Sequence, residues 1–214
     1  MNGGAITNNG DCGVCVYGGA FTMNGGTISG NTASGNNSGG GYGGGVYVDQ
    51  GGTFTITGGE ISGNTAVGGG GVYVNNNSTF AMTNSVISGN EASKGGGVYM
   101  NSGHLYVSGV SSVSGNTNSV GAANNVYLPI DKEIAVSNLT AGASIGVTTA
   151  TVPVTFTAGA SEDDSVYFFS DNPGYHVEWD GSKLLLASGT VYPSYLGLPA
   201  DPTDDTEADA IIRA

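Results

Sequence analysis

The sequence predicts an all-β fold in which short strands wind into a repeating solenoid, and two repeated strings carry the prediction. Gly-Gly-Val-Tyr-Val occurs at Gly44–Val48 and Gly70–Val74, and Gly-Gly-Val-Tyr-Met follows at Gly96–Met100, each a step of 26 residues. Ile-Ser-Gly-Asn keeps the same step at Ile61–Asn64 and Ile87–Asn90. Strands this short bury too little surface alone, so neighbouring repeats must stack. We therefore predict a right-handed, single-stranded parallel β-helix with about 26 residues per coil.

Each coil consists of three expected strands separated by turns rich in Gly and Asn, which tolerate positive φ at the corners. In the coil Gly70–Gly95 these strands are Val72–Val74, Thr79–Thr83 and Val86–Ser88. Alternate side chains of a strand face the same side, which fixes the inward rows. The residues expected to face inward are Val14/Val16, Val46/Val48, Val72/Val74, Val98/Met100 and Val126/Leu128 in the first strand, Phe21/Met23, Phe54/Ile56, Phe80/Met82 and Leu105/Val107 in the second, and Ile28, Ile61, Ile87 and Val113 in the third.

A buried ladder of asparagines is the second structural expectation. One Asn closes the turn after the third strand of each coil. Identical positions of successive coils lie about 4.8 Å apart, within reach of an amide hydrogen bond. The expected members are Asn31, Asn64, Asn90 and Asn116.

The repeat weakens after Asn125, and this divides the chain into three parts. Residues 1–128 are expected to form regular coils, residues 129–190 irregular terminal coils and a cap, and residues 191–214 an acidic tail or linker. Within the cap, a strand is expected at Val166–Phe169. A hairpin is expected where Asp-Gly joins two apolar runs, from His176 to Leu186.

The composition excludes several classes of partner. The chain has 4 Lys and Arg against 17 Asp and Glu, for a net charge of −13. Phosphate recognition needs clustered cations, so nucleic acid is not expected as a partner, and anionic glycans and anionic membranes are disfavoured on the same ground. No apolar run approaches the roughly 18 residues of a membrane span, so no membrane insertion of this segment is expected.

At this point the repeats indicate a family resemblance. Gly-Gly-Gly-Val-Tyr-Val paired with Ile-Ser-Gly-Asn resembles the GGA(I/V) and FxxN repeats of polymorphic outer-membrane adhesins, and more closely the repeats of large adhesin-like surface proteins of gut bacteria. Ile or Val replaces Phe in the second motif, and the similarity covers about residues 1–128. The resemblance implies a right-handed parallel β-helix displayed outside the cell, secreted or on the bacterial surface.

The chain is expected to be a fragment of a longer protein. Met1-Asn-Gly-Gly-Ala-Ile repeats the string Met23-Asn-Gly-Gly-Thr-Ile, so the sequence begins in the middle of a repeat. A signal peptide or an anchor would then lie outside it.

A row of tyrosines is the candidate binding surface. The outward residue of the first strand is Tyr in four successive coils, and its ring and hydroxyl suit sugar rings or a protein partner. We therefore predict contact with a host or cell-surface glycan or protein through exposed faces, including the expanded corner Ser34–Tyr42. The alternative is that the rings only stack on each other and stiffen the sheet. The predicted contact residues are Tyr47, Tyr73, Tyr99 and Tyr127.

Catalysis is the rival interpretation, because parallel β-helices also include polysaccharide lyases and hydrolases. A lyase of this kind needs an Arg or Lys base beside calcium-binding carboxylates, but the single arginine is Arg213 and Lys94 stands in a corner. A glycosidase needs two carboxylates about 5 to 10 Å apart, and Glu60 and Glu91 fall at different offsets in the repeat. We therefore expect a non-catalytic adhesion module, with a polysaccharide-active enzyme or a pure spacer stalk as alternatives.

No cofactor and no metal are expected, although two groups of residues are candidates. Glu162, Asp163 and Asp164, with Asp171 nearby, could bind Ca²⁺, and the alternative is a solvated turn. Cys12 and Cys15 form a lone C-x-x-C without the second ligand pair of a zinc site. A structural role, a local disulfide and a metal site remain open for them.

Overall fold

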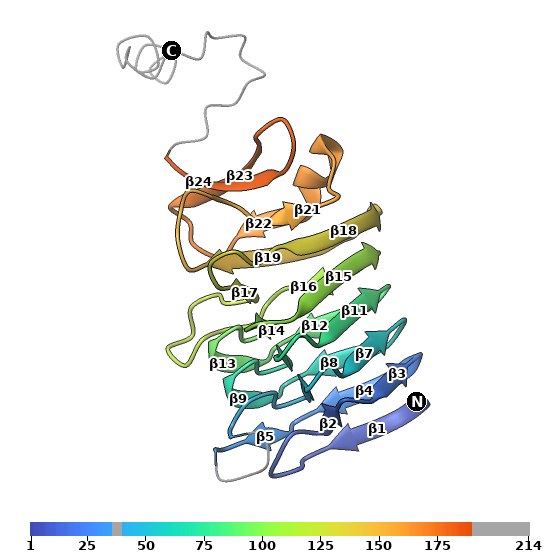
Figure 1. The fold of residues 1–214 in the computed structure, drawn as a ribbon. Coiled ribbons are helices and arrows are strands. Elements are labelled where there is room, and N and C mark those ends of the chain that lie inside the picture. The colour runs from blue at the N-terminus through green and yellow to red at the C-terminus, as the bar shows by residue number, and fades with distance from the viewer. Residues whose placement is uncertain (36–39, 190–214) are drawn as a thin grey trace, which may run out of the picture.

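The computed structural model describes residues 1–35 and 40–189, which form a parallel β-helix. Figure 1 shows the coils stacked in chain order from β1 to the terminal hairpin β23–β24. The acidic segment 191–214 and part of the corner Ser34–Tyr42 lie outside the described residues.

Three of the strand rows follow the predicted pattern. The first row contains β2 (Val14–Tyr17), β6 (Val46–Asp49), β10 (Val72–Val74), β14 (Val98–Met100) and β17 (Val126–Leu128). The second row is a six-stranded sheet of β3 (Ala20–Met23), β7 (Thr53–Ile56), β11 (Thr79–Thr83), β15 (His104–Gly109), β18 (Ile134–Leu139) and β21 (Thr157–Ala158). The third row contains β1 (Asn2–Thr7), β4 (Gly25–Ser29), β8 (Glu60–Ser62), β12 (Val86–Ser88) and β16 (Ser112–Val113).

Three coils contain a fourth strand, which corrects the prediction of three strands per coil. These strands are β5 (Thr32–Ala33), β9 (Thr65–Gly68) and β13 (Glu91–Lys94), and they pair in parallel in a sheet of their own. The sequence of this fourth segment is typical of a turn, because the segment is short and leads into glycine residues. The stacked copies nevertheless complete each other's backbone hydrogen bonds, which a buried or half-buried backbone requires.

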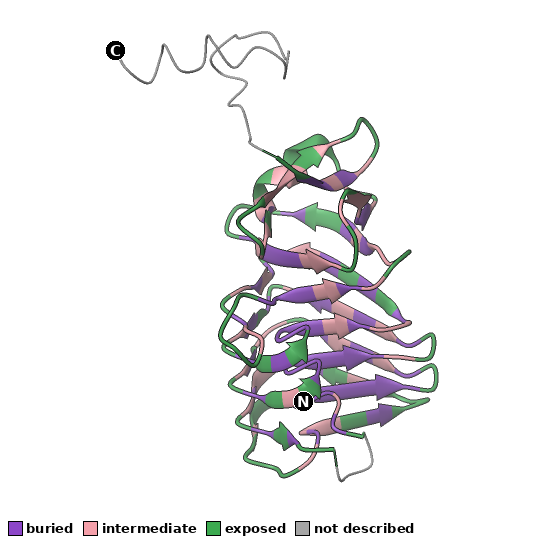
Figure 2. Cartoon of the chain, turned by 90° about the vertical axis from the view of Figure 1, so that its left-hand side faces the viewer, coloured by how far each residue is buried: buried purple, intermediate pink, exposed green. Residues whose placement is uncertain are grey.

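Identical positions pair directly between coils, as the repeat predicts. Val72 lies between Val46 and Val98, and Ile87 lies beside Ile61. The predicted inward residues between Met23 and Leu128 are buried (Figure 2). Phe54 and Phe80 stack at 5.1 Å between ring centroids. Val14 and Phe21 are only half-buried, because they belong to the coil at the N-terminal end of the column.

β19 (Ser144–Thr149) ends the regular part of the column by joining two rows. Its Ile145 pairs with Val113 of the third row, and its Val147 pairs with Val126 of the first row. One straight strand thus replaces the corner that separates these rows in earlier coils. The single 12-stranded sheet is the result.

The asparagine ladder is confirmed and is longer than predicted. Each side-chain amide nitrogen donates to the side-chain oxygen of the next member, at 2.7 to 3.0 Å, from Asn9 to Asn125. The Asn125 amide then donates to the carboxylate of Asp171 at 2.5 Å. Asp171 also accepts from the Asn125 backbone N–H and the Thr148 hydroxyl, and its burial raises its pKa. The members in order are Asn9, Asn31, Asn64, Asn90, Asn116, Asn125 and Asp171.

The cap confirms the predicted hairpin and corrects one strand. β23 (Tyr175–Trp179) and β24 (Leu184–Ser188) pair antiparallel around the Asp-Gly turn, and β20 (Val154–Thr155) adds to the same sheet. The segment expected as a strand at Val166–Phe169 begins instead as the last turn of η1 (Glu162–Tyr167), a 3₁₀ helix, and continues as β22 (Phe168–Ser170). Ser161 and Asp164 cap that helix, which explains the difference.

Candidate functional site

The predicted tyrosine surface lies largely inside the molecule, which corrects the expectation that it is exposed. Tyr47 and Tyr73 point away from the aliphatic core but are only 8% and 6% exposed, and Tyr99 and Tyr127 are half-buried. The corner segment before each first strand folds over the rings. A Cβ at Gly69, for example, would lie 2.7 Å from the Cβ of Tyr73. Tyr47 and Tyr73 therefore offer no surface to a partner.

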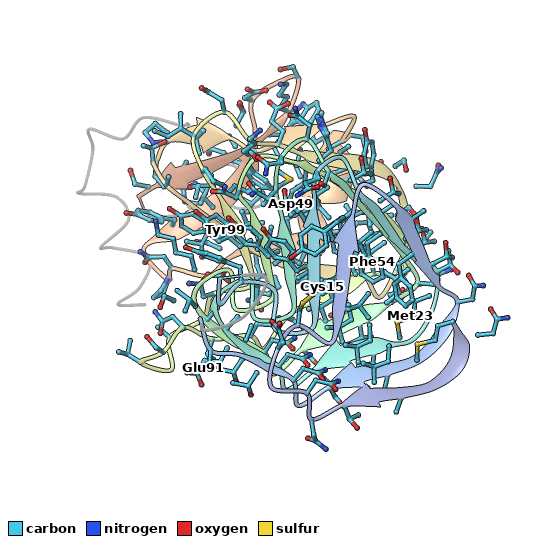
Figure 3. The ribbon with its side chains drawn as sticks, turned by 60° about the horizontal axis from the view of Figure 1, so that its bottom comes forward. Cys15, Met23, Asp49, Phe54, Glu91 and Tyr99 are labelled. Carbon is cyan, nitrogen blue, oxygen red and sulfur yellow. A yellow bond between two sulfur atoms is a disulfide. The ribbon has the colours of Figure 1, made fainter. Side chains whose placement is uncertain are left out.

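The four tyrosines form a second, aromatic column beside the aliphatic one. The ring centroids of successive members are 5.2 to 5.5 Å apart, and Tyr42 stacks on Tyr73 at 4.6 Å. Lys94 Nζ lies 5.2 Å from the ring centroid of Tyr127, a cation–π distance. In Figure 3 the side chain of Tyr99 lies among the strands, whereas Glu91 lies at the outer corner. This geometry matches the alternative role, in which stacked rings stiffen the sheet.

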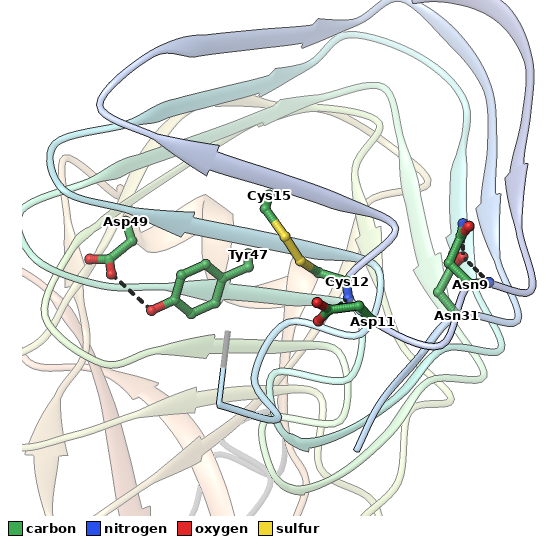
Figure 4. The surroundings of a disulfide bond; sticks show 7 residues. All are labelled: Asn9, Asp11, Cys12, Cys15, Asn31, Tyr47 and Asp49. Atoms are coloured by element: carbon green, nitrogen blue, oxygen red, sulfur yellow. Dashed lines mark hydrogen bonds between the residues drawn. A yellow bond between two sulfur atoms is a disulfide. The ribbon is translucent and has the colours of Figure 1, made fainter. Parts of the chain in front are cut away.

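A disulfide closes the N-terminal end of this column. Cys12 and Cys15 are bonded, with their Cα atoms 6.0 Å apart (Figure 4). Cys15 occupies the register position of Tyr47, and Cys12 is buried in one hydrophobic cluster with Tyr47 and Tyr73. The disulfide thus takes the place of one more ring. The sequence left a structural role, a local disulfide and a metal site open for the C-x-x-C motif, and in the structure the two cysteines form the local disulfide.

Alkaline titration should reveal the buried tyrosines. Burial, with a smaller effect of the hydrogen bond to Asp49, raises the pKa of Tyr47 from 10.0 to about 12. The unfolded chain ionises first, so the free energy of unfolding should fall as pH rises from 10 toward 12. Phenolate absorbance of the folded protein should show a late rise that Tyr47→Phe reduces but does not remove, because burial also raises the pKa of Tyr73. Ionisation of Tyr47 near pH 10 in the folded protein would contradict its burial.

The acidic candidates for a metal site are not brought together. Glu162, Asp163 and Asp164 stand in the first turn of η1, where the Asp164 carboxylate accepts from the Ser161 N–H and hydroxyl at 2.8 Å. Asp171 is engaged at the end of the asparagine ladder instead. Among residues 1–35 and 40–189, no group of three or more His, Cys, Asp or Glu could hold a metal ion. The arrangement is that of a capped, solvated turn.

The two carboxylates weighed for catalysis lie in different strand rows, whereas Lys94 is in the same strand as Glu91 and Arg213 lies outside the described residues. Glu60 pairs with Thr27 and Val86 in the third row, whereas Glu91 pairs with Thr65 in the fourth row. The structure therefore does not place these two carboxylates in one strand row, as their offsets in the repeat predicted.

The outer face of the six-stranded sheet carries a feature that the sequence analysis did not single out as a site. Its outward residues in β7 and β11 are half-buried Thr and Ala, but in β15 the same position is Tyr106, which is 48% exposed. The next strand places Ala135 beside it, and the strand after that places Ala158 beside Ala135. A hollow of about 320 Å³, here called the Tyr106 hollow, is lined by Gly103, His104, Leu105, Tyr106, Asp131, Lys132, Glu133, Ala135 and Ala158.

The sequence does contain a signal for this hollow. The outward position reads Thr22, Thr55 and Ala81 in the first three coils, then Tyr106, and then Ala135. In the buried rows, identical or similar residues stack on one another. A large residue such as Tyr106 between the small Ala81 and Ala135 therefore departs from the repeat. Such a departure is visible only once the register of all five strands is known.

Comparison with known families supports the architecture. The sequence model of a family described as "Right handed beta helix region" matches residues 1–145, more than half of the chain. The chain belongs to this right-handed β-helix family. The predicted fold class, a right-handed parallel β-helix, is thereby confirmed together with the parallel strand rows. No curated protein and no solved structure matches the chain significantly. Within the described residues, no helix is long and apolar enough to span a membrane.

Proposed function

We propose that this β-helix is a non-catalytic structural and adhesion module of an extracellular bacterial protein. It contacts a host or cell-surface glycan or a protein partner through the outer face of its six-stranded sheet. The observation that carries this proposal is the Tyr106 hollow, where a half-exposed aromatic ring and several polar side chains meet on an otherwise regular face. Exposed aromatic rings with polar neighbours are common anchors in recognition sites.

The rigid column supports a role in display. The core runs without interruption from Val16 to Leu186, and the asparagine ladder connects seven members across the coils. A solenoid of this kind holds its outer face in a fixed geometry, which lowers the ordering cost of binding.

The disulfide supports a location outside the cytoplasm. Cys12 and Cys15 are bonded, and disulfides persist mainly in oxidising environments such as the extracellular space and the bacterial periplasm. The resemblance of the repeats to bacterial adhesins supports the same location. The polar and acidic composition fits a secreted or surface-attached segment.

Binding experiments with face-specific variants test this function. The purified chain is applied to an array of neutral glycans and extracellular proteins, and retained binding is measured. Thr55→Arg with Ala81→Arg, which places two charges on the outer face of the six-stranded sheet, should weaken binding at least tenfold. Thr65→Arg with Ser93→Arg places the same charge on exposed positions of the fourth row and serves as the matched control.

The alternative functions give distinct results in the same experiment. A pure spacer binds nothing on the array, and this outcome would refute the adhesion role. Release of reducing ends or unsaturated products from a polysaccharide would identify an enzyme instead. Equal loss of binding in both double variants would show that the contact face is misassigned.

A further inference from the structure

The Tyr106 hollow has the chemistry of a sugar-binding subsite, and its parts come from three coils. β15 supplies Tyr106 and His104, the loop before β18 supplies Asp131 and Lys132, and the floor beyond the ring is formed by Ala135 and Ala158. The strands are paired in register, so the β-helix itself fixes Tyr106, Ala135 and Ala158 relative to one another. We propose that this hollow binds a neutral pyranose unit of a glycan, with the ring of Tyr106 as its stacking surface. This inference rests on the proposed adhesion function.

The surroundings of Tyr106 leave its ring free for a ligand. Ala81 precedes it and Ala135 follows it in the sheet, so no neighbouring aromatic ring covers it from within the sheet. The tyrosines of the aromatic column, in contrast, contact each other at 5.2 to 5.5 Å. A flat ring beside two methyl groups offers an apolar surface of the kind that packs against the C–H face of a sugar.

Polar groups on the rim can hydrogen-bond to hydroxyl groups. His104 and Asp131 are exposed and Lys132 is half-buried, and all three line the hollow. Together they offer both donors and acceptors, which is what sugar hydroxyls require. Glu133 also lines the hollow, and its Oε1 atom is engaged in an ion pair with Lys183. Sites for small ligands typically have a small number of precisely positioned polar groups around an apolar surface.

Charge argues for a neutral sugar. The chain carries a net charge of −13, and at the hollow the cations are balanced by carboxylates, since Lys132 stands beside Asp131 and Lys183 pairs with Glu133. The field around the hollow therefore disfavours carboxylated or sulfated sugars. The volume of about 320 Å³ lies at the lower end of the range of ligand pockets, which suits one or two sugar rings of a longer chain.

Affinity electrophoresis of the chain in native gels tests the proposal. The probes are soluble neutral polysaccharides (a mixed-linkage β-glucan, a galactomannan and a xyloglucan), with polygalacturonate as the acidic probe. We expect retardation by at least one neutral probe and none by polygalacturonate. Tyr106→Ala should weaken binding at least tenfold, and Tyr106→Phe should keep most of it because the stacking surface remains. Ala135→Leu, which fills the hollow and leaves the ring in place, should also weaken it.

Thr65→Ala is the matched control, since Thr65 is an exposed strand residue of the fourth row, away from the outer face of the six-stranded sheet. Circular dichroism and thermal unfolding verify that each variant is folded. If a neutral glycan binds equally well to wild type and Tyr106→Ala, this inference is wrong while the adhesion function stands. Stronger binding of polygalacturonate than of any neutral probe would overturn the assigned ligand class. If none of the neutral probes retards the chain, the hollow is not a sugar subsite, while binding to a protein on the array would still support adhesion.

Discussion

Replacing Asn90 with alanine should lower the free energy of unfolding by about 4 kcal/mol. Asn90 is fully buried, and its side-chain oxygen accepts from both the backbone N–H and the amide of Asn64. Its own amide donates to the Ile61 carbonyl and to Asn116. Alanine removes one hydrogen bond from each of these four groups. The Asn64 amide still donates to the Ile28 carbonyl, and the Asn116 oxygen still accepts from the backbone N–H of residue 90. The Asn64 backbone N–H and the Ile61 carbonyl lose their side-chain partner, and each buried group left unsatisfied costs about 1–3 kcal/mol. The sum is discounted because the site relaxes in part.

Urea unfolding of purified variants measures this cost. The control is Asn101→Ala, which removes a single hydrogen bond to Asn75 at a half-exposed position. Water replaces that partner, so the expected loss is below about 1 kcal/mol. Asn90→Asp should not rescue Asn90→Ala, because a carboxylate cannot donate to the Ile61 carbonyl and a buried charge is costly. Equal costs for Asn90→Ala and Asn101→Ala would mean that the ladder does not hold the coils together.

The aliphatic column and the ladder could be predicted because both depend on a fixed spacing. When coils are stacked in register, residues one repeat apart meet, so Val72 reaches Val46 and Asn64 reaches Asn90 without any knowledge of the turns. The extension of the ladder could not be predicted in this way. Asn125 follows Asn116 by only 9 residues, and Asp171 directly follows β22 in the cap. These contacts depend on β19, which joins the third row to the first row and so shortens the last coils.

The burial of the tyrosines escaped prediction for a different reason. Alternation along the strand correctly turned Tyr47 and Tyr73 away from the aliphatic core. It could not tell that a fourth strand and its glycines would cover the outward side, because Gly68 and Gly69 contribute no side chain to a pattern of hydrophobicity. Whether the outward side of a strand is also buried depends on the segments that pack over it, and the sequence of the strand itself does not show this. The exposed ring of Tyr106 has the opposite explanation, since none of the segments within residues 1–35 and 40–189 covers it, and the residue stays 48% exposed.

The glycines before the first strand lead to the second large prediction. Gly70 is buried and its φ is not in the left-handed region, so the need for glycine comes from space. A Cβ at Gly70 would lie 2.5 Å from the carbonyl oxygens of both Glu91 and Gly96. Both are backbone atoms of the next coil, and Gly70 itself donates to the Gly95 carbonyl at 3.1 Å. Gly70→Ala should therefore cost about 3 kcal/mol, at the upper end of the usual cost of overpacking.

Gly19→Ala is the matched control for this variant. Gly19 is exposed, it also avoids the left-handed region, and the nearest atom to an added Cβ is the Tyr17 carbonyl oxygen at 4.0 Å. Alanine fits there and restricts the unfolded chain, so the expected change lies between zero and a gain of about 1 kcal/mol. Thermal and urea unfolding of both variants measure the difference. The coils would have to separate to admit the methyl group of Gly70→Ala. If Gly70→Ala shows no greater loss of stability than Gly19→Ala, the coils are not in contact at this corner. The run of glycines would then reflect turn conformation alone, and the close approach of coils that buries the tyrosine column would have no support.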